Sequence, residues 1–172
     1  MRLIRLAVVL ALAQPALAHA IDRASPFSPG HRTLGQATLL IVQGRYVEAE
    51  PILREALAID PMLVEAHYNR GVVLRHLGHP AEAIDELRVA LSLYAPNDES
   101  NRAKCLYGIA FAAEDTGDTQ AATQAWRDYI AFDQKFSPSD PVLEIARAHL
   151  DYEKALARQE RLKIPGTQKA TR

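Results

Sequence analysis

Apolar and small residues recur along this chain at a fixed distance of 34 residues. The set Gly44, Tyr46, Ala49, Leu53, Ala56, Leu57 and Ile59 returns as Gly78, Pro80, Ala83, Leu87, Ala90, Leu91 and Leu93. A fixed period of this length is typical of stacked units, none of which buries its apolar face alone. The pattern therefore predicts a repeat architecture.

The spacing of apolar residues within each period is helical. It predicts six helices in three pairs, at residues 32–43 with 46–59, 63–77 with 80–93, and 99–116 with 118–133. The third pair follows the second by 39 residues, with the five extra residues around the polar stretch 97–101. Asp140 and Pro141 are a typical helix start, and we expect a seventh helix from there to about Leu162. One face of it is expected to carry Val142, Ile145, His149, Tyr152 and Leu156.

Small residues stand where helices of one unit, and of successive units, would cross closely: Ala37, Gly71 and Ala110 in the first helices, and Ala49, Ala83 and Ala122 in the second. Leu53, Leu87 and Trp126 fill the neighbouring large apolar column, so Trp126 is expected in the core. Tyr129 interrupts a further small column formed by Ala56 and Ala90. In these positions the chain resembles the tetratricopeptide repeat (TPR) family, whose unit is a 34-residue helix–turn–helix.

The resemblance implies an all-α fold, a right-handed α-solenoid of about three TPR units with a C-terminal capping helix. The expected units are residues 32–61, 62–96 and 97–136, followed by the capping helix at 137–162 and a disordered tail at 163–172.

TPR stacks resemble each other in binding a peptide or a partner's helix on a concave face built mainly from first helices. Carried over position by position, the predicted partner-binding residues are Tyr68, Asn69, Val72, Arg75, His76, Lys104, Tyr107, Phe111 and Glu114, with Leu34 and Gly108 on the same face. For Tyr68 and Tyr107, contact with a partner and packing against adjacent helices both stay open. Members that clamp a C-terminal carboxylate carry a set of Lys, Arg and Asn residues of which only Asn69 and Lys104 are present here, so we do not expect that function.

Residues 1–20 have the pattern of a secretory signal peptide. Arg2 and Arg5 precede a short apolar run, and small residues allow cleavage after Ala18 or Ala20. Residues 21–31, rich in Pro and small polar residues, are expected to be a linker. This interpretation predicts a mature chain in the periplasm.

Composition and residue types argue against several classes of function. The formal net charge of −1 does not favour nucleic-acid binding, and contact with a membrane is expected only indirectly, through a partner. Cys105 is the single cysteine, which excludes an intrachain disulfide, and it is expected to be a buried apolar side chain. His76 and His79 lack the further ligands of a metal site, and no nucleophile or phosphate-loop motif is present.

We therefore expect no catalysis, no cofactor and no metal. The predicted function is an exported adaptor, monomeric or weakly homo-oligomeric, that binds a protein or peptide partner in cell-envelope assembly or maturation. The alternative is a structural TPR subunit that self-associates through the Tyr129 region and the last helix.

Overall fold

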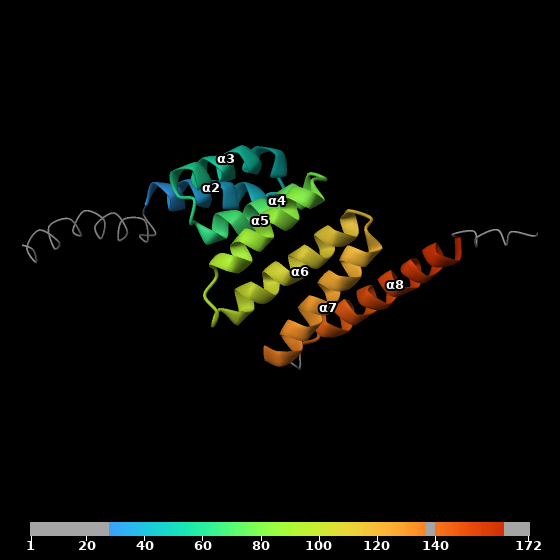
Figure 1. Cartoon of the computed structure of the whole chain (residues 1–172). Helices are drawn as coiled ribbons and strands as arrows, with labels where there is room; N and C mark the ends of the chain where they lie inside the picture. The colour runs from blue at the N-terminus through green and yellow to red at the C-terminus, as the bar shows by residue number, and fades with distance from the viewer. Residues whose placement is uncertain (1–27, 137–139, 164–172) are drawn as a thin grey trace, which may run out of the picture.

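The computed structural model describes residues 28–136 and 140–163, and these residues form helices without strands (Figure 1). The helices are α2 (Pro29–Val42), α3 (Tyr46–Ile59), α4 (Val64–His76), α5 (Pro80–Leu93), α6 (Glu99–Asp115), α7 (Thr119–Phe136) and α8 (Val142–Lys163). The all-α prediction is confirmed. The predicted leader, most of the linker and the tail beyond residue 163 lie outside the described residues.

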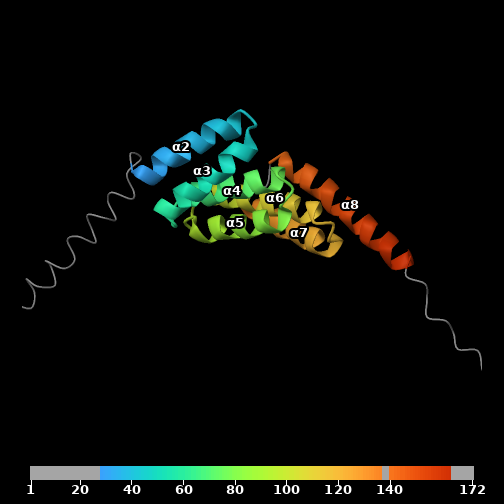
Figure 2. The same ribbon diagram turned by 90° about the horizontal axis from the view of Figure 1, so that it is seen from above.

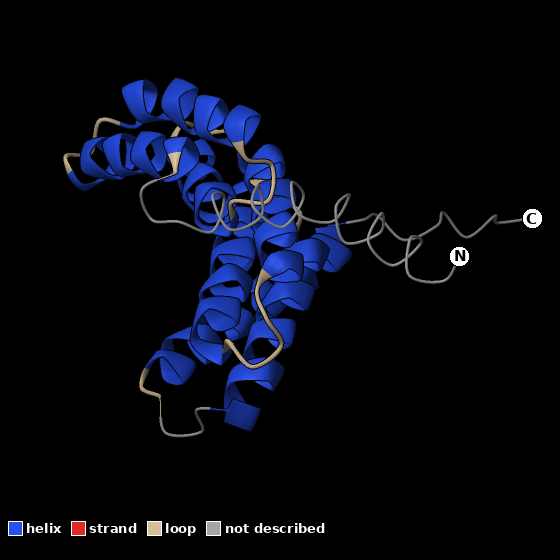
Figure 3. Cartoon of the chain, turned by 90° about the vertical axis from the view of Figure 1, so that its left-hand side faces the viewer, coloured by secondary structure: helices blue, strands red, loops and turns tan. Residues whose placement is uncertain are grey.

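The helices are arranged as antiparallel pairs stacked one after another (Figures 1 and 2). The most extensive contacts join α2 with α3, α4 with α5, and α6 with α7, and each pair packs on the next through α3 with α4 and α5 with α6. The direction of the helices turns along the stack, as Figure 3 shows. α8 packs on α7 in the way that α4 packs on α3, so it takes the place of the first helix of a further pair.

Each pair turns at a glycine with a left-handed backbone: φ is +72° at Gly44, +80° at Gly78 and +76° at Gly117. After Gly117, the Asp118 N–H donates to the Thr116 hydroxyl at 3.2 Å. After Gly44 and Gly78, the next residue instead donates its backbone N–H to a carbonyl of the last helical turn, as His79 does to Leu74 at 2.9 Å. This hydrogen bond satisfies a carbonyl that the ending helix leaves free, and glycine adopts the required φ without a steric cost.

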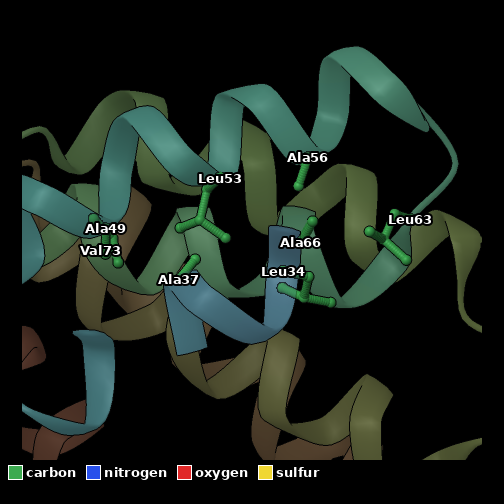
Figure 4. Packing of buried hydrophobic residues seen from close by; sticks show 8 residues of the cluster. All are labelled: Leu34, Ala37, Ala49, Leu53, Ala56, Leu63, Ala66 and Val73. Atoms are coloured by element: carbon green, nitrogen blue, oxygen red, sulfur yellow. The ribbon is translucent and has the colours of Figure 1, made fainter. Parts of the chain in front are cut away.

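Small residues let the helices approach while large ones fill the space between them. In the first unit Leu53 lies fully buried among Ala37, Ala49 and Ala56, with Val73 from the next unit beside it (Figure 4). Its cluster also contains Leu34, Leu63 and Ala66. Leu34 was expected on the concave face, but it is 8% exposed because its side chain points into this core.

The third unit and α8 share an aromatic core. Trp126 is fully buried, as the sequence predicts, in a cluster with Ala110, Tyr129 and Ala146. The Tyr129 ring lies 5.2 Å from that of Tyr107, and only 3% of the residue is exposed. Tyr129 therefore fills space inside the protein, which removes it from any self-association surface.

Three boundaries or faces differ from the sequence-based expectation. α2 begins at Pro29, inside the predicted linker, because the Ser28 hydroxyl caps it by accepting the His31 N–H and Pro29 suits a first helical turn. α7 continues to Phe136, three residues past the predicted end. The buried face of α8 runs through Leu143 and Ala146, and the expected face is wrong in part, since Ile145 and Tyr152 are 50% and 61% exposed. The small Ala146 side chain lets α8 approach α7 closely on this other face.

Candidate partner-binding face

The first helices line the inner side of the stack. α4 contacts both α2 and α6, whereas among the described residues the second helices α3, α5 and α7 make no comparable contacts with one another. A row of helices whose members touch lies on the shorter, inner side of a curved stack. We call the exposed side of α2, α4 and α6 the inner face.

An ion pair and an aromatic ring join α4 to α6 in the middle of the inner face. Arg75 Nε donates to Asp115 Oδ2 at 2.6 Å, and the guanidinium carbon of Arg75 lies 4.9 Å from the centre of the Phe111 ring. Arg75 keeps 33% of its side chain exposed. Two of the predicted residues, Arg75 and Phe111, thus come together, and the fork of the guanidinium retains donors for a carboxylate or carbonyl of a partner.

Tyr107 and Phe111 form the aromatic part of this face. Their rings meet edge to face at 4.8 Å, and each also meets the buried Trp126 edge to face, at 5.7 and 5.0 Å. Burial raises the pKa of Tyr107, and the nearby Arg75 lowers it in part. Burial likewise raises the pKa of Tyr68. The tyrosines are therefore half-buried: one side of each packs internally and the other side is open.

Glu114 connects the inner face to the core and to α8. Its Oε1 accepts a hydrogen bond from Trp126 Nε1 at 2.7 Å and lies 2.8 Å from His149 Nδ1. The side chain is 18% exposed. This arrangement gives Glu114 a positioning role inside the protein, and its contact with a partner stays a prediction.

The other predicted partner-binding residues lie further apart from one another on the inner face. Asn69 Nδ2 donates to the Thr38 hydroxyl at 3.4 Å, linking α4 to α2. His76 stacks flat on Tyr46, with 4.2 Å between ring centres, and is still exposed. Lys104 is exposed and donates to Asn101 Oδ1 at 3.0 Å. Val72 is half-buried and lies on α4, between Asn69 and His76 in the sequence.

Sequence reasoning missed a polar network behind this face. Arg70 of α4 pairs with Glu86 of α5 and, at 3.4 Å, with Glu50 of α3, and His67 Nδ1 lies 2.6 Å from the second oxygen of Glu86. All four side chains are mostly buried, with 13–18% exposed. The one available signal was the presence of charged residues in columns that are apolar elsewhere in the repeat.

Two positions rule out a family-type carboxylate clamp on the inner face. Leu34 is buried, and Gly108 faces the Leu87 side chain, where an added Cβ would lie 3.1 Å from Leu87 Cδ1. A cationic side chain at either place would have to displace core atoms. The expectation drawn from the residue types is thus supported by the packing.

Cys105 is fully buried, as predicted, and burial raises the pKa of its thiol to about 12. Such a thiol stays protonated and is a poor nucleophile. In residues 28–136 and 140–163, no three His, Cys, Asp or Glu side chains gather closely enough to hold a metal ion. Among the same residues, no helix combines the length and apolarity needed to cross a membrane.

Comparisons with known proteins agree with the fold of stacked helix pairs. A family model described as tetratricopeptide repeat matches residues 34–101. The solved Sgt2 TPR domain from Aspergillus fumigatus is similar in fold, with a TM-score of 0.62 and 14% identity over 86% of this chain and 91% of that one.

A second similar structure is the first TPR of Spaghetti (RPAP3) bound to the HSP90 peptide SRMEEVD. Its TM-score is 0.60, with 19% identity over 74% of this chain and 93% of that one. Among curated protein sequences, no relative matches. The tetratricopeptide repeat model thus matches residues 34–101, and the stacked helix pairs have the same all-α fold as these two TPR domains.

Proposed function

We propose that this protein is an adaptor that binds a segment of a partner protein along the inner face, with the main contacts on α4 and α6. The observation that carries the proposal is the Arg75–Phe111–Tyr107 group, which offers open aromatic edges beside a cation on neighbouring first helices. Aromatic and arginine side chains supply much of the affinity at protein interfaces.

The similar RPAP3 domain, whose structure contains a bound peptide, supports binding of a peptide by the same fold. The residues offered here differ from a carboxylate clamp, so the expected ligand is an internal segment with apolar side chains for Tyr107 and Phe111. A hydrogen-bond acceptor in that segment would meet Arg75.

In-cell photo-crosslinking tests the proposal. A photoreactive amino acid replaces Lys104, which is exposed beside Tyr107, and in a parallel strain replaces Val47, which is 75% exposed on the second helix α3. We expect a defined protein adduct from position 104 and none from position 47. Adducts from position 47 alone would move the binding surface to the outer side and refute the proposal.

A charge-reversal pair tests whether the adduct reflects specific binding. Arg75→Glu removes the pair with Asp115, and Arg88→Glu on α5 removes the exposed pair with Asp85, so both variants change the charge equally and lose one ion pair. The adduct from position 104 should be lost with Arg75→Glu and kept with Arg88→Glu. Equal loss in both variants would contradict a site at Arg75.

We further propose that residues 1–20 direct export and that the adaptor works in the periplasm, in envelope assembly or maturation. The charged start, apolar run and small residues before Ala18 and Ala20 support this proposal. A fusion to alkaline phosphatase, which is active only after export, should show activity that disappears when residues 1–20 are deleted. Activity without residues 1–20, or none with them, would refute export.

Self-association is the second candidate, because α8 exposes Ile145, Tyr152 and Leu162. Ile145 and Tyr152 lie two turns apart on the same side of α8, and an exposed apolar patch on one face can serve as a contact surface. Analytical ultracentrifugation of residues 21–172 should then show a concentration-dependent dimer that Tyr152→Glu abolishes. A monomer at every concentration would exclude this candidate.

A further inference from the structure

A polar cleft separates the first half of α7 from the second half of α8. Its volume is about 770 Å³, and it is lined chiefly by Thr119, Thr123 and Arg127 from α7 and by Lys154, Arg158 and Arg161 from α8. None of the predicted partner-binding residues contributes to it. We call it the α7–α8 cleft, and it is separate from the inner face.

The arginines of this cleft differ from most arginines of the repeats, because they form no ion pair with another described residue. Arg45, Arg54, Arg70, Arg75 and Arg88 each pair with an acidic side chain.

By contrast, Arg127, Arg158 and Arg161 form no ion pair within the part of the chain that the structure describes. Lys154 Nζ forms an ion pair with Asp151 Oδ1 at 3.0 Å. The acidic residue of the lining, Glu160, accepts a hydrogen bond from the Thr119 hydroxyl at 2.9 Å. Three arginines thus line one cleft without an ion pair among the described residues, beside the single carboxylate of Glu160.

The uncharged lining also provides hydrogen-bond donors. Thr123 lies one turn after Thr119, and its hydroxyl oxygen is buried without a hydrogen-bond partner among the described residues. Gln120 and Gln124 add side-chain amides on the same helix. Guanidinium groups with nearby amide donors are suited to carboxylate or phosphate oxygens.

The spacing of the cations indicates the shape of the ligand. Residues 154, 158 and 161 follow one another at about 6 and 4.5 Å along α8, so the row is about 10 Å long, from a rise of about 1.5 Å per residue. Alternate side chains of an extended chain repeat at about 7 Å on one side. A short extended segment with acidic side chains at alternate positions can therefore place two carboxylates along this row of about 10 Å, which a single compact anion does not span.

We propose that the α7–α8 cleft binds an acidic, extended segment of a partner protein. Its carboxylates pair with Arg127, Arg158 and Arg161, and its backbone accepts from the side-chain amides of Gln120 and Gln124. This second surface would let the adaptor hold a partner at two places, which raises the overall affinity without new contacts on the inner face.

Fluorescence anisotropy with the full chain and a labelled hexaglutamate peptide tests the proposal, with hexaglutamine as the uncharged reference. Arg158→Glu reverses a cation inside the cleft. Arg147→Glu reverses an exposed arginine of the same helix that does not line the cleft, so it is the matched control. We expect the hexaglutamate affinity to fall at least about tenfold with Arg158→Glu and less than about twofold with Arg147→Glu.

Several results would overturn an acidic peptide site in this cleft. The first is equal weakening by the two substitutions, and the second is no binding of hexaglutamate by the unaltered chain. Inorganic phosphate that binds as tightly as the peptide, with the same dependence on Arg158, would show a small-anion site instead. Stronger binding to phosphatidylglycerol vesicles than to the peptide would assign the cations to a lipid surface.

Discussion

The approach of α4 to α5 at Gly71 provides a direct test of how tightly the repeats pack. A Cβ atom added at Gly71 would lie 2.6 Å from Leu87 Cγ and 3.2 Å from the carbonyl oxygen of Ala83. Leu87 is 1% exposed, and its other side faces Gly108, so the side chain has no free space to move into. We predict that Gly71→Ala destabilises the protein.

Two opposing effects set the size of the change in stability caused by Gly71→Ala. Forcing a methyl group into a packed core costs about 1–3 kcal/mol. Alanine is favoured over glycine inside a helix by roughly 1 kcal/mol. The net destabilisation by Gly71→Ala should therefore be about 1 kcal/mol. Gly35 in α2 is an exposed helical glycine with nothing within 4 Å of its added Cβ, so Gly35→Ala should stabilise by up to about 1 kcal/mol.

Urea unfolding followed by far-ultraviolet circular dichroism measures both variants. The sharper comparison uses Leu87→Ala as a background, which itself should cost about 2–5 kcal/mol. Once the leucine is shortened, its two contacts with the added Cβ disappear and the 3.2 Å contact with the Ala83 carbonyl oxygen remains, so Gly71→Ala should cost less in this background than in the unaltered protein. If Gly71→Ala stabilises the unaltered protein as much as Gly35→Ala does, the close approach is wrong.

Three further measurements test the interior. Trp126→Ala should cost about 3–5 kcal/mol in urea unfolding because the ring is fully buried, and a change below about 1 kcal/mol would remove it from the core. Arg102→Ala should cost about 1.5–3 kcal/mol, since Arg102 Nη1 donates to the Leu91 carbonyl at 3.0 Å at the end of α5; no loss would refute that bond. A thiol reagent at about pH 8 should modify Cys105 only after unfolding. Because the folded state raises the pKa of this thiol from 9.0 to about 12, its stabilising contribution should be present below pH 9 and decline as the pH rises toward 12. The same unfolding experiment with Cys105→Ala should show a smaller decline, because the pKa of Tyr94, which burial raises to about 12, accounts for another part of it.

The repeat pattern predicts the pairs and turns well because each is decided locally. A glycine at Gly44, Gly78 or Gly117 adopts the left-handed turn, and the small and large columns follow from helix crossings that recur with the period. The start of α2 was missed because Pro29 and Gly30 are typical of linkers, although Ser28 before them is a good cap.

The face of α8 could not be predicted for a different reason. The helix carries apolar residues on two sides, one through Leu143 and one through Ile145, and a periodic pattern alone does not rank them. The surface of α7 makes the choice, because Trp126 and Tyr129 leave room for the small Ala146. Prediction of a face therefore needs the partner helix.

Prediction of the candidate site from the sequence also fails without the neighbouring helices, and Glu114 is the clearest example. Its position in the repeat puts it on the exposed side of a first helix, next to Asp115. The Trp126 indole and the His149 ring, from two other helices, then occupy its carboxylate. Asp115, one residue on, instead meets Arg75 across the inner face. Adjacent carboxylates with the same sequence signal thus act in different places, and long-range contacts decide which one a partner can reach.

Because of these contacts, the side chains at the α6 end of the inner face are held more firmly than those at the α2 end. At α6, Phe111 is held between Arg75, Trp126 and His149, with ring centres within 5.1 Å of its own. At α2, the link to α4 on this face is the 3.4 Å hydrogen bond between Asn69 and the Thr38 hydroxyl. A rigid aromatic group loses little conformational entropy on binding, whereas exposed polar side chains must be ordered. Most of the affinity for a partner is therefore expected at α6, with α2 and the first half of α4 adjusting to the sequence that extends from it.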